Sequence, residues 1–280
     1  MRTVLMVELL GRRVRLETNE PAAAQHLAHV FPTVLTVEED QVAEFSLALL
    51  MRQDRVEVYW QDILLGQYES LQQAVLWADF WLLERLARES GLLVLHGACL
   101  IAPEMGIILL GNGSTGKSGM SRLLMSLGFH YGSDEAVGID DEGWAFPFPR
   151  ALLLKGEHPD VQSGAAVAAT ENLLHALDGR VYEAPSVPIV QALSKWQVVE
   201  LERVRDTRSA RLEKLPLVEG LAVTVRHVLD RSGWRRPIFQ QLVNRLAERP
   251  ALRLSFSDFG QGAAQLAALF DRSEEDVENG

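Results

Sequence analysis

The spacing of apolar and polar residues in the first quarter of the chain is that of β-strands. From Arg55 to Trp60, apolar Val56 and Val58 alternate with polar positions. A repeat of two residues is typical of strands that bury one face. The other segments with strand character are 3–9, 14–17 and 30–37, and a turn is expected at 19–21. We therefore expect a small β-rich region over residues 1–66.

From Ser70 onward the spacing becomes helical. Apolar residues recur three and four positions apart from Leu71 to Leu86, Ser70 can cap the first turn, and Gly91 follows the pattern. Residues 92–140 then alternate strand, loop, helix and strand. The strands are predicted at 92–95, 106–110 and 129–132, and the helix at 117–127. This order predicts an α/β sheet in which a helix connects neighbouring parallel strands.

The C-terminal part is predicted to be mainly helical. Helices are expected near 168–177 and at 218–230, 238–247 and 263–270, with strands at 197–203 and 252–256. Ser257 can cap the last helix. Residues 273–280 form an acidic tail. The predicted organisation is therefore a β-rich region (1–66), an α/β domain with a helical C-terminal part (67–272) and a tail (273–280).

Composition and charge narrow the function classes. The 280 residues are 48% apolar and 23% charged, as in globular proteins. The formal net charge is −11, which argues against a nucleic-acid or membrane-surface partner. Cys99 is the only cysteine and the N-terminus lacks the order of a signal peptide, so a cytoplasmic protein is expected.

One segment carries a complete phosphate-binding motif, G-x-x-x-x-G-K-[ST]. An apolar strand precedes it and an amphipathic helix follows it. Its residues, with the next one, are Gly111, Asn112, Gly113, Ser114, Thr115, Gly116, Lys117, Ser118 and Gly119. Glycines let the backbone amides turn toward phosphate oxygens, Lys117 reaches the outer phosphates, and the Ser118 hydroxyl can ligate Mg²⁺. The motif predicts a site for ATP and Mg²⁺.

Two further places carry candidate chemistry. Asp134 and Glu135 follow the strand after the motif, which a parallel sheet would place beside the strand of the loop. One carboxylate could hold Mg²⁺ and the other could accept a proton, although an exposed acidic turn is the alternative interpretation. His96 ends the strand before the loop strand. It is either a structural histidine or, if its strand neighbours the loop strand, a group that lies near the transferred phosphate or orients Asp134.

These motifs together resemble the catalytic domain of HPr kinase/phosphorylase. The resemblance is closer to the HPr-kinase-related proteins of bacterial biosynthetic gene clusters. It is carried by 96–98, 106–118 and 128–135, extends to the Pro-, Arg- and Lys-containing stretch 147–155, and covers about residues 90–160. It implies a phosphate-loop core of the HPr kinase and phosphoenolpyruvate-carboxykinase type. It also implies an ATP-dependent kinase that phosphorylates a Ser or Thr hydroxyl of a protein or peptide.

The resemblance also implies roles for single residues. Asp134 matches the base, His96 the histidine facing the loop, Lys117 the phosphate lysine and Ser118 the metal hydroxyl, with Glu135 as the second metal ligand. Arg150 and Lys155 could offset charge on the transferring group or be a solvated basic pair. Relatives of this kind are often oligomers, so a homo-oligomer is expected.

The sequence departs from the family pattern at three points. Glu135 replaces an Asp, Gly119 stands where HPr kinases have Glu, and the Glu-Ile-Arg-Gly-Leu-Gly signature of the bifunctional enzymes is absent. The missing signature predicts that phosphorylase activity is absent. The two substitutions leave open a nucleotide-binding regulatory or scaffold subunit whose chemistry has decayed. A kinase acting on a small metabolite is the third interpretation.

Overall fold

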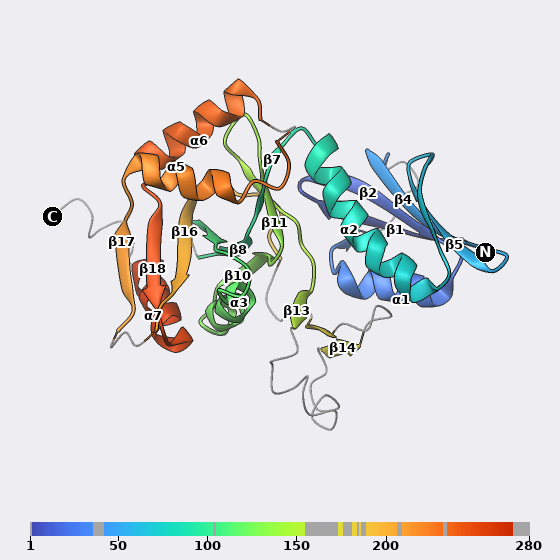
Figure 1. Ribbon diagram of the computed structural model, residues 1–280, viewed down its shortest axis with the longest axis horizontal. Helices are drawn as coiled ribbons and strands as arrows, with labels where there is room; N and C mark the ends of the chain where they lie inside the picture. Colours follow the sequence, from blue (N-terminus) through green and yellow to red (C-terminus); the bar gives the residue numbers. More distant parts are fainter. Residues whose placement is uncertain are drawn as a thin grey trace. The chain divides into compact units, whose positions relative to one another are not determined.

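The computed structural model describes residues 2–35, 42–102, 105–154, 173–175, 181–183, 185, 189–205, 209–231 and 234–270. These residues form a mixed α/β fold of several sheets and helices, shown in Figure 1. The chain divides into two compact units, each built from two segments. The first unit comprises Met1–Ser90 and Pro149–Ser186, and the second comprises Gly91–Phe148 and Val187–Gly280.

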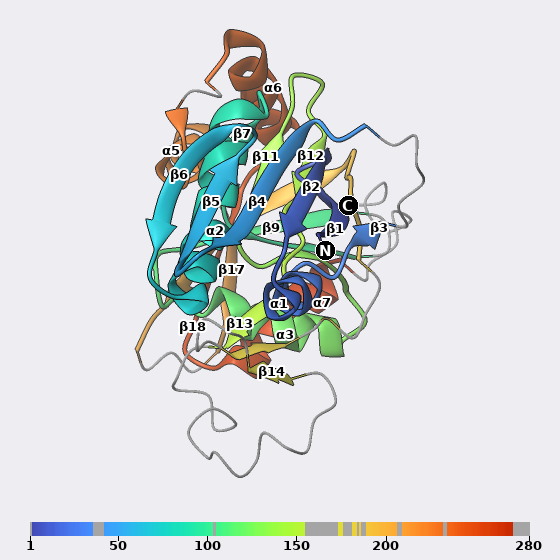
Figure 2. The same ribbon diagram turned by 90° about the vertical axis from the view of Figure 1, so that its right-hand side faces the viewer.

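The first unit is built on a six-stranded sheet of order β3-β1-β2-β4-β5-β6. Its strands are β1 (Thr3–Leu9), β2 (Arg12–Thr18), β3 (Val34–Leu35), β4 (Phe45–Arg52), β5 (Arg55–Trp60) and β6 (Ile63–Tyr68). Figure 2 shows β6, β5, β4, β2 and β1 side by side in that order. The alternation over 55–60 predicted a strand that buries one face, and Val56, Val58 and Trp60 are indeed fully buried. The β-rich character of the N-terminal region is thus confirmed.

Two helices cover this sheet, and one was not predicted. Helix α1 (Pro21–Val30) lies where a turn was expected at 19–21, because Pro21 occupies the first helical position and fits it well. It ends at Val30, so the expected strand 30–37 is wrong at 30–33. Its described part is β3, and residues 36 and 37 lie outside the described ranges. Helix α2 (Leu71–Glu89) confirms the predicted helix, and the Ser70 hydroxyl accepts a hydrogen bond from the Gln73 amide at 3.2 Å.

The two units do not meet at residue 66, where the sequence predicted the end of the β-rich region. Helix α2 packs on β4, β5 and β6, so the contacts of the first unit continue to Ser90. A second segment, after Phe148, joins it with a three-stranded sheet of β13 (Leu152–Leu154), β15 (Val181–Glu183) and β14 (Leu173–His175). A buried ion pair between Arg150 Nη1 and Asp79 Oδ2, 2.7 Å long, ties this segment to α2. The helix expected near 168–177 is wrong at 173–175, and its other residues lie outside the described ranges.

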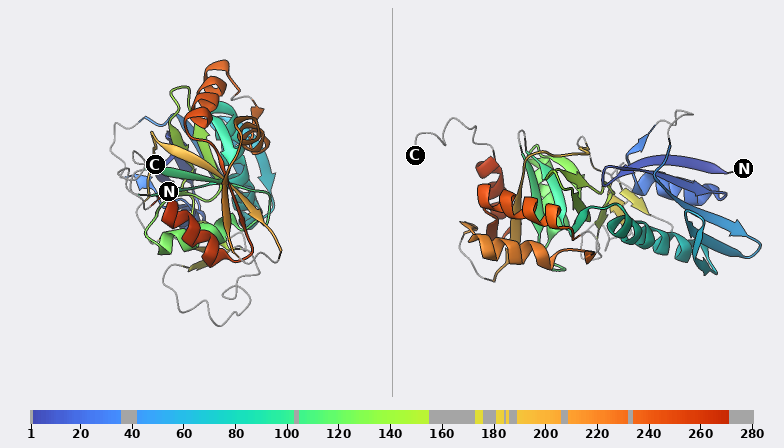
Figure 3. Two further views of the ribbon diagram at one scale, coloured as in Figure 1. Left: turned by 90° about the vertical axis from the view of Figure 1, so that its left-hand side faces the viewer. Right: turned by 90° about the horizontal axis from the view of Figure 1, so that it is seen from above.

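The second unit contains a six-stranded sheet of order β10-β8-β9-β16-β18-β17, and Figure 3 (left) shows its strands fanning out with the usual twist. The strands are β8 (Ala98–Ile101), β9 (Gly106–Leu110), β10 (His130–Ser133), β16 (Trp196–Arg203), β17 (Arg211–Lys214) and β18 (Leu252–Phe256). Strands β9, β16 and β18 run parallel to one another. A separate three-stranded sheet contains β12 (Ala145–Pro147), β11 (Ala136–Ile139) and β7 (Leu93–His96).

The helices of the second unit are α3 (Lys117–Ser126), α5 (Leu217–Arg226), α6 (Arg236–Glu248) and α7 (Phe259–Phe270). All four were predicted, although some ends differ: α6 begins two residues and α7 four residues earlier than expected. Helix α5 stops at Arg226, four residues early, because His227 and Leu229 turn away to bond with the strand β7. The cap of α7 is Asp258 and not Ser257, since the Asp258 carboxylate accepts the Gln261 amide at 2.8 Å.

Candidate functional site

The candidate phosphate loop connects a fully buried strand of the second unit to a helix. All five residues of β9 are buried, and β8 and β16 flank that strand. Residues 111–116 leave its carboxyl end, and α3 begins at Lys117. This is the strand–loop–helix context that the motif requires.

Glycines are needed at two positions of this loop. Gly116 has a φ of 95°, in the left-handed region, and a Cβ added there would overlap the ring of Phe259. A Cβ at Gly111 would lie 2.6 Å from the Thr115 hydroxyl oxygen. By contrast, a Cβ at Gly113 would meet no atom within 4 Å. The left-handed backbone of the loop therefore lies at Gly116 and at Ser114, which has a φ of 67°, whereas Gly111 is required for space and Gly113 borders open space.

The concave side of the loop collects hydrogen-bond donors. The Lys117 ammonium, on a buried side chain, donates to the Gly111 carbonyl at 2.9 Å, so it reaches back across the loop. Gly116 caps α3 without a side chain, and the first helical bond runs from the Met120 amide to the Gly116 carbonyl at 2.9 Å. The preceding amides of the first turn have no acceptor within the helix. A helix N-terminus, an ammonium and the Ser118 hydroxyl in one turn form a donor set that fits a polyphosphate.

Asp134 and Glu135 lie in a tight turn between β10 and β11. The Ser133 hydroxyl shapes this turn, because it donates to the Phe148 carbonyl at 2.7 Å and accepts the amides of Glu135 and Ala136, each at 3.1 Å. Asp134 is only 8% exposed. The sequence prediction placed the pair at the end of this strand, and the structure has it there. The alternative of an exposed acidic turn is wrong for Asp134.

His96 and Glu135 are in contact. The His96 Nδ1 lies 3.0 Å from the Glu135 carbonyl oxygen and 3.7 Å from its carboxylate Oε1. A carbonyl can only accept a hydrogen bond, so this contact assigns the proton to Nδ1. In the neutral ring, Nε2 is then the basic nitrogen. The structure thus brings together two of the predicted site residues.

The expected strand neighbours were wrong. Strand β8 lies between β9 and β10, and it is antiparallel to both. Because β9 and β10 therefore run in the same direction, Asp134 still emerges at the edge of the sheet where the loop begins, one strand farther away than expected. Strand β7, which ends at His96, pairs with β11 and not with β9. The hairpin of β8 and β9 pairs Ala98 with Leu109, which places the chain just before β8 beside the start of the loop.

His227 is a residue of this site that the sequence did not indicate. Its carbonyl accepts the backbone amide of His96 at 2.7 Å. Burial, together with the positive charges of Lys117, His96 and Arg226, lowers the pKa of its ring to about 4. His227 is therefore neutral near pH 7 in a surrounding of positive potential. No local motif could have found it, because it reaches the site through a contact distant in sequence.

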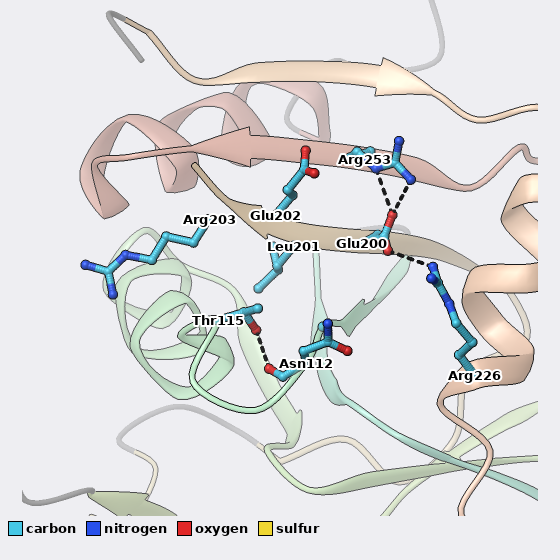
Figure 4. Close-up of a pocket in the computed structure, with 9 residues that line it drawn as sticks. Asn112, Thr115, Glu200, Leu201, Glu202, Arg203, Arg226 and Arg253 are labelled. Atoms are coloured by element: carbon cyan, nitrogen blue, oxygen red, sulfur yellow. Dashed lines mark hydrogen bonds and ion pairs between the residues drawn. The ribbon is translucent and has the colours of Figure 1, made fainter. Parts of the chain in front are cut away.

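A cavity of about 360 Å³ adjoins the loop on the side of β16. It is lined by Gly111, Asn112, Thr115, Glu200, Leu201, Glu202, Arg203, Arg226 and Arg253, most of them labelled in Figure 4. Glu200 lies between two guanidinium groups, with Arg226 at 3.2 Å and Arg253 at 2.8 Å. None of the cavity residues outside the loop was predicted from the sequence, since they come from β16, β18 and the end of α5.

Ser118 and Glu135 are the residues predicted to bind Mg²⁺. Across the described residues, there is no group of three or more His, Cys, Asp or Glu side chains that could hold a metal ion. Mg²⁺ commonly takes one or two protein ligands and completes its shell with phosphate oxygens and water, and a hydroxyl with a carboxylate suits that mode. The pairing of Ser118 with Glu135 stays a prediction.

The remaining candidates lie elsewhere. Arg150 is buried in the first unit against Asp79, so it is not a solvated basic residue, and Lys155 lies outside the described ranges. No helix in the described parts of the chain is long and apolar enough to cross a membrane.

Comparison with known proteins adds one distant likeness. No model of a known protein family and no curated protein matches the sequence. Among solved structures, the chain is similar to the Hpr(Ser) kinase/phosphatase from Coxiella burnetii, with 13% sequence identity and a TM-score of 0.33. The match covers 67% of this chain and 99% of that one. Similarity at this level carries neither activity nor substrate to this chain.

Proposed function

We propose that the protein is a Mg²⁺-dependent kinase that transfers the γ-phosphoryl group of ATP to a Ser or Thr hydroxyl of a protein or peptide. The observation that carries this proposal is the loop of residues 111–118. Its last residue before helix α3 is Gly116, so no cap side chain covers the first amides of the helix. The Lys117 ammonium reaches back across the loop to the Gly111 carbonyl. The carboxylates of Asp134 and Glu135 emerge at the same edge of the sheet.

The loop residues bind and orient the phosphates. Backbone amides at the start of α3 and the helix dipole stabilise the negative charge of the phosphates, and the Lys117 ammonium reaches the outer phosphates. Ser118 and Glu135 would hold Mg²⁺ together with phosphate oxygens. The ion supplies positive charge that offsets the charge developing on the transferring group.

Asp134 is the proposed base. In the transfer step, the acceptor oxygen forms a bond to the γ-phosphorus while the bond from that phosphorus to the bridging oxygen breaks, which releases ADP. The hydroxyl proton passes to the Asp134 carboxylate. His96, through its contact with Glu135, positions the turn that carries both carboxylates.

A second candidate function is a nucleotide-binding regulatory or scaffold subunit. It is favoured by Gly119, which adds no carboxylate to the first turn of α3, and by Glu135, which stands where the family pattern has Asp. In that case ATP binds to the loop and no phosphate is transferred. A kinase for a small metabolite would share the same loop and the same base.

The test has two steps. Calorimetry should show Mg²⁺-dependent ATP binding that Lys117→Ala weakens strongly, and equal affinity in both proteins would exclude the loop as the site. Transfer from γ-labelled ATP to a serine- and threonine-containing peptide library should then fall about 10²–10⁴-fold in Asp134→Asn, as expected for loss of a positioned base. Asp141→Asn, an exposed carboxylate of the same unit, is the matched control. Transfer at the wild-type rate in Asp134→Asn would exclude that base, and binding without transfer would favour the regulatory subunit.

A further inference from the structure

The cavity beside the loop has a size and a position that suit part of a bound nucleotide. Its volume of about 360 Å³ lies within the range of small-molecule pockets. Gly111, Asn112 and Thr115 belong both to the phosphate loop and to the cavity wall, so a ligand in the cavity is continuous with phosphates on the loop. Figure 4 shows the loop along one border and the end of β16 along the other.

The charges of the lining fit a ligand with hydroxyl groups better than a second anion. Glu200 is held by Arg226 and Arg253, and Arg253 also binds Glu219 at 2.7 Å, so these arginines are already partly neutralised. Glu202 is an exposed carboxylate whose Oε2 accepts the Ser255 hydroxyl at 2.7 Å. Among the described residues, no cation forms an ion pair with Glu202. Its carboxylate would repel an anion and can accept hydrogen bonds from neutral donors.

The position of the proposed base indicates which end of the nucleotide the cavity would take. In an in-line transfer, the acceptor oxygen and the leaving group lie on opposite sides of the phosphorus. Asp134 comes from the end of β10, on the β8 side of β9. Outside the loop, all the cavity residues except Arg226 come from β16 and β18, on the other side of β9. If the acceptor approaches from the side of the base, the nucleoside lies on the side of the cavity.

We propose that this cavity binds the nucleoside of ATP, with the Glu202 carboxylate accepting hydrogen bonds from the ribose hydroxyls. The inference rests on the proposed function, because it takes the phosphates to lie on the loop. Carboxylates serve the same purpose in other nucleotide sites, where they accept the ribose hydroxyl. Arg203 and Arg226 also line the cavity with exposed side chains. The Arg226 guanidinium offers a flat cationic surface to a base, whereas that of Arg203 lies over the Phe259 ring, 5.3 Å from its centroid.

Calorimetry on the full chain tests this with three probes, all in the presence of Mg²⁺. Methyl triphosphate carries the phosphates without a nucleoside, and 2′,3′-dideoxy-ATP carries the base without the ribose hydroxyls. ATP should bind at least about tenfold more tightly than either probe, the size of one hydrogen bond to a charged group. Equal affinity for ATP and dideoxy-ATP in the wild type would overturn the proposal. Because these measurements use the unaltered protein, they do not depend on the folding of a variant.

A variant then assigns the effect to Glu202. Glu202→Ala should lower ATP affinity about tenfold, leave methyl triphosphate unchanged and abolish the difference between ATP and dideoxy-ATP. Glu248→Ala, an exposed carboxylate on α6 away from the cavity, is the matched control and should change none of the three. If Glu202→Ala weakens ATP and methyl triphosphate equally, the nucleoside assignment fails while the loop remains the phosphate site. If the wild type binds none of the probes, the proposed function itself fails.

Discussion

A position can require glycine because its backbone has a positive φ or because a Cβ would overlap a neighbouring group. Three glycines near helix α3 allow these two causes to be measured separately. Gly116 has a positive φ and lies against the Phe259 ring, whereas Gly128 has the same φ of 95° but a Cβ there would meet no atom within 4 Å. Gly113 has neither constraint. Alanine at each position therefore tests backbone strain and steric overlap separately.

The expected losses in unfolding free energy follow from these differences. Left-handed backbone costs a non-glycine residue about 1–2 kcal/mol, which is the full expectation for Gly128→Ala. Overpacking against the Phe259 ring adds about 1–3 kcal/mol, so Gly116→Ala should lose about 2–5 kcal/mol. Gly113→Ala should stay within about 0.5 kcal/mol of the wild type. Phe259→Leu shortens the side chain that the new Cβ of Gly116→Ala would overlap. In a double-mutant cycle, combining the two substitutions should therefore restore about 1–3 kcal/mol of the unfolding free energy.

Urea denaturation of the wild type and these variants measures these values, and calorimetry with ATP and Mg²⁺ measures the effect on the site. Gly116→Ala should lower ATP affinity because the start of α3 must move, while Gly128→Ala, at the other end of the helix, should not. Equal destabilisation by Gly116→Ala and Gly128→Ala would refute the contribution of Phe259. Destabilisation by Gly113→Ala as large as by Gly116→Ala would refute the description of the loop.

Three further outcomes are expected. Asp79→Asn should destabilise the first unit by about 3–5 kcal/mol, because it removes the counterion of the buried Arg150 guanidinium. Asp62→Asn, at an exposed position, is the control and should leave the unfolding free energy unchanged. Equal effects of the two substitutions would contradict the buried ion pair. His227 has a lowered pKa of about 4 against an ordinary 6.5, so the unfolded chain binds its proton first and stability should fall as the pH drops from about 6.5 to about 4. Urea denaturation at pH 7 and pH 5 should show a smaller loss in His227→Gln, and the same loss in both proteins would exclude this origin. Burial raises the pKa of the Cys99 thiol to about 12, so a thiol reagent at pH 8 should modify it only as fast as the protein unfolds; immediate reaction would contradict its burial.

Local signals in the sequence predicted the parts of the fold that depend on neighbouring residues. The phosphate motif identified the loop between β9 and α3, and Ser70 identified the start of α2, because caps and glycine turns act over a few residues. Strand order could not be predicted in this way. A hairpin places β8 beside β9, and nothing near Asp134 indicates that a strand intervenes.

The same limit applies to the candidate site. Lys117 and the amides of α3 could be named as phosphate-binding groups from the sequence because one motif contains them all, and that role stays a prediction. His227 and the lining of the cavity come from segments about one hundred residues away, which only the folded sheet brings to the loop. The cap of α7 shows the limit on a small scale, since Ser257 and Asp258 are equally good caps by type and only the backbone geometry selects Asp258.

The interleaved composition of the two units has a consequence for synthesis on the ribosome. Domains made from one continuous stretch can fold as soon as they emerge, N-terminal first. Here the first unit includes Pro149–Ser186, and the segment Gly91–Phe148, which contains the phosphate loop, is translated before that unit is complete. Strand β16, which flanks the loop strand, is translated later still. A nascent chain stalled near residue 150 therefore holds an N-terminal sheet without its last segment, and a loop strand β9 that has β8 but not yet β16 beside it. No single cut in the gene would yield either unit whole.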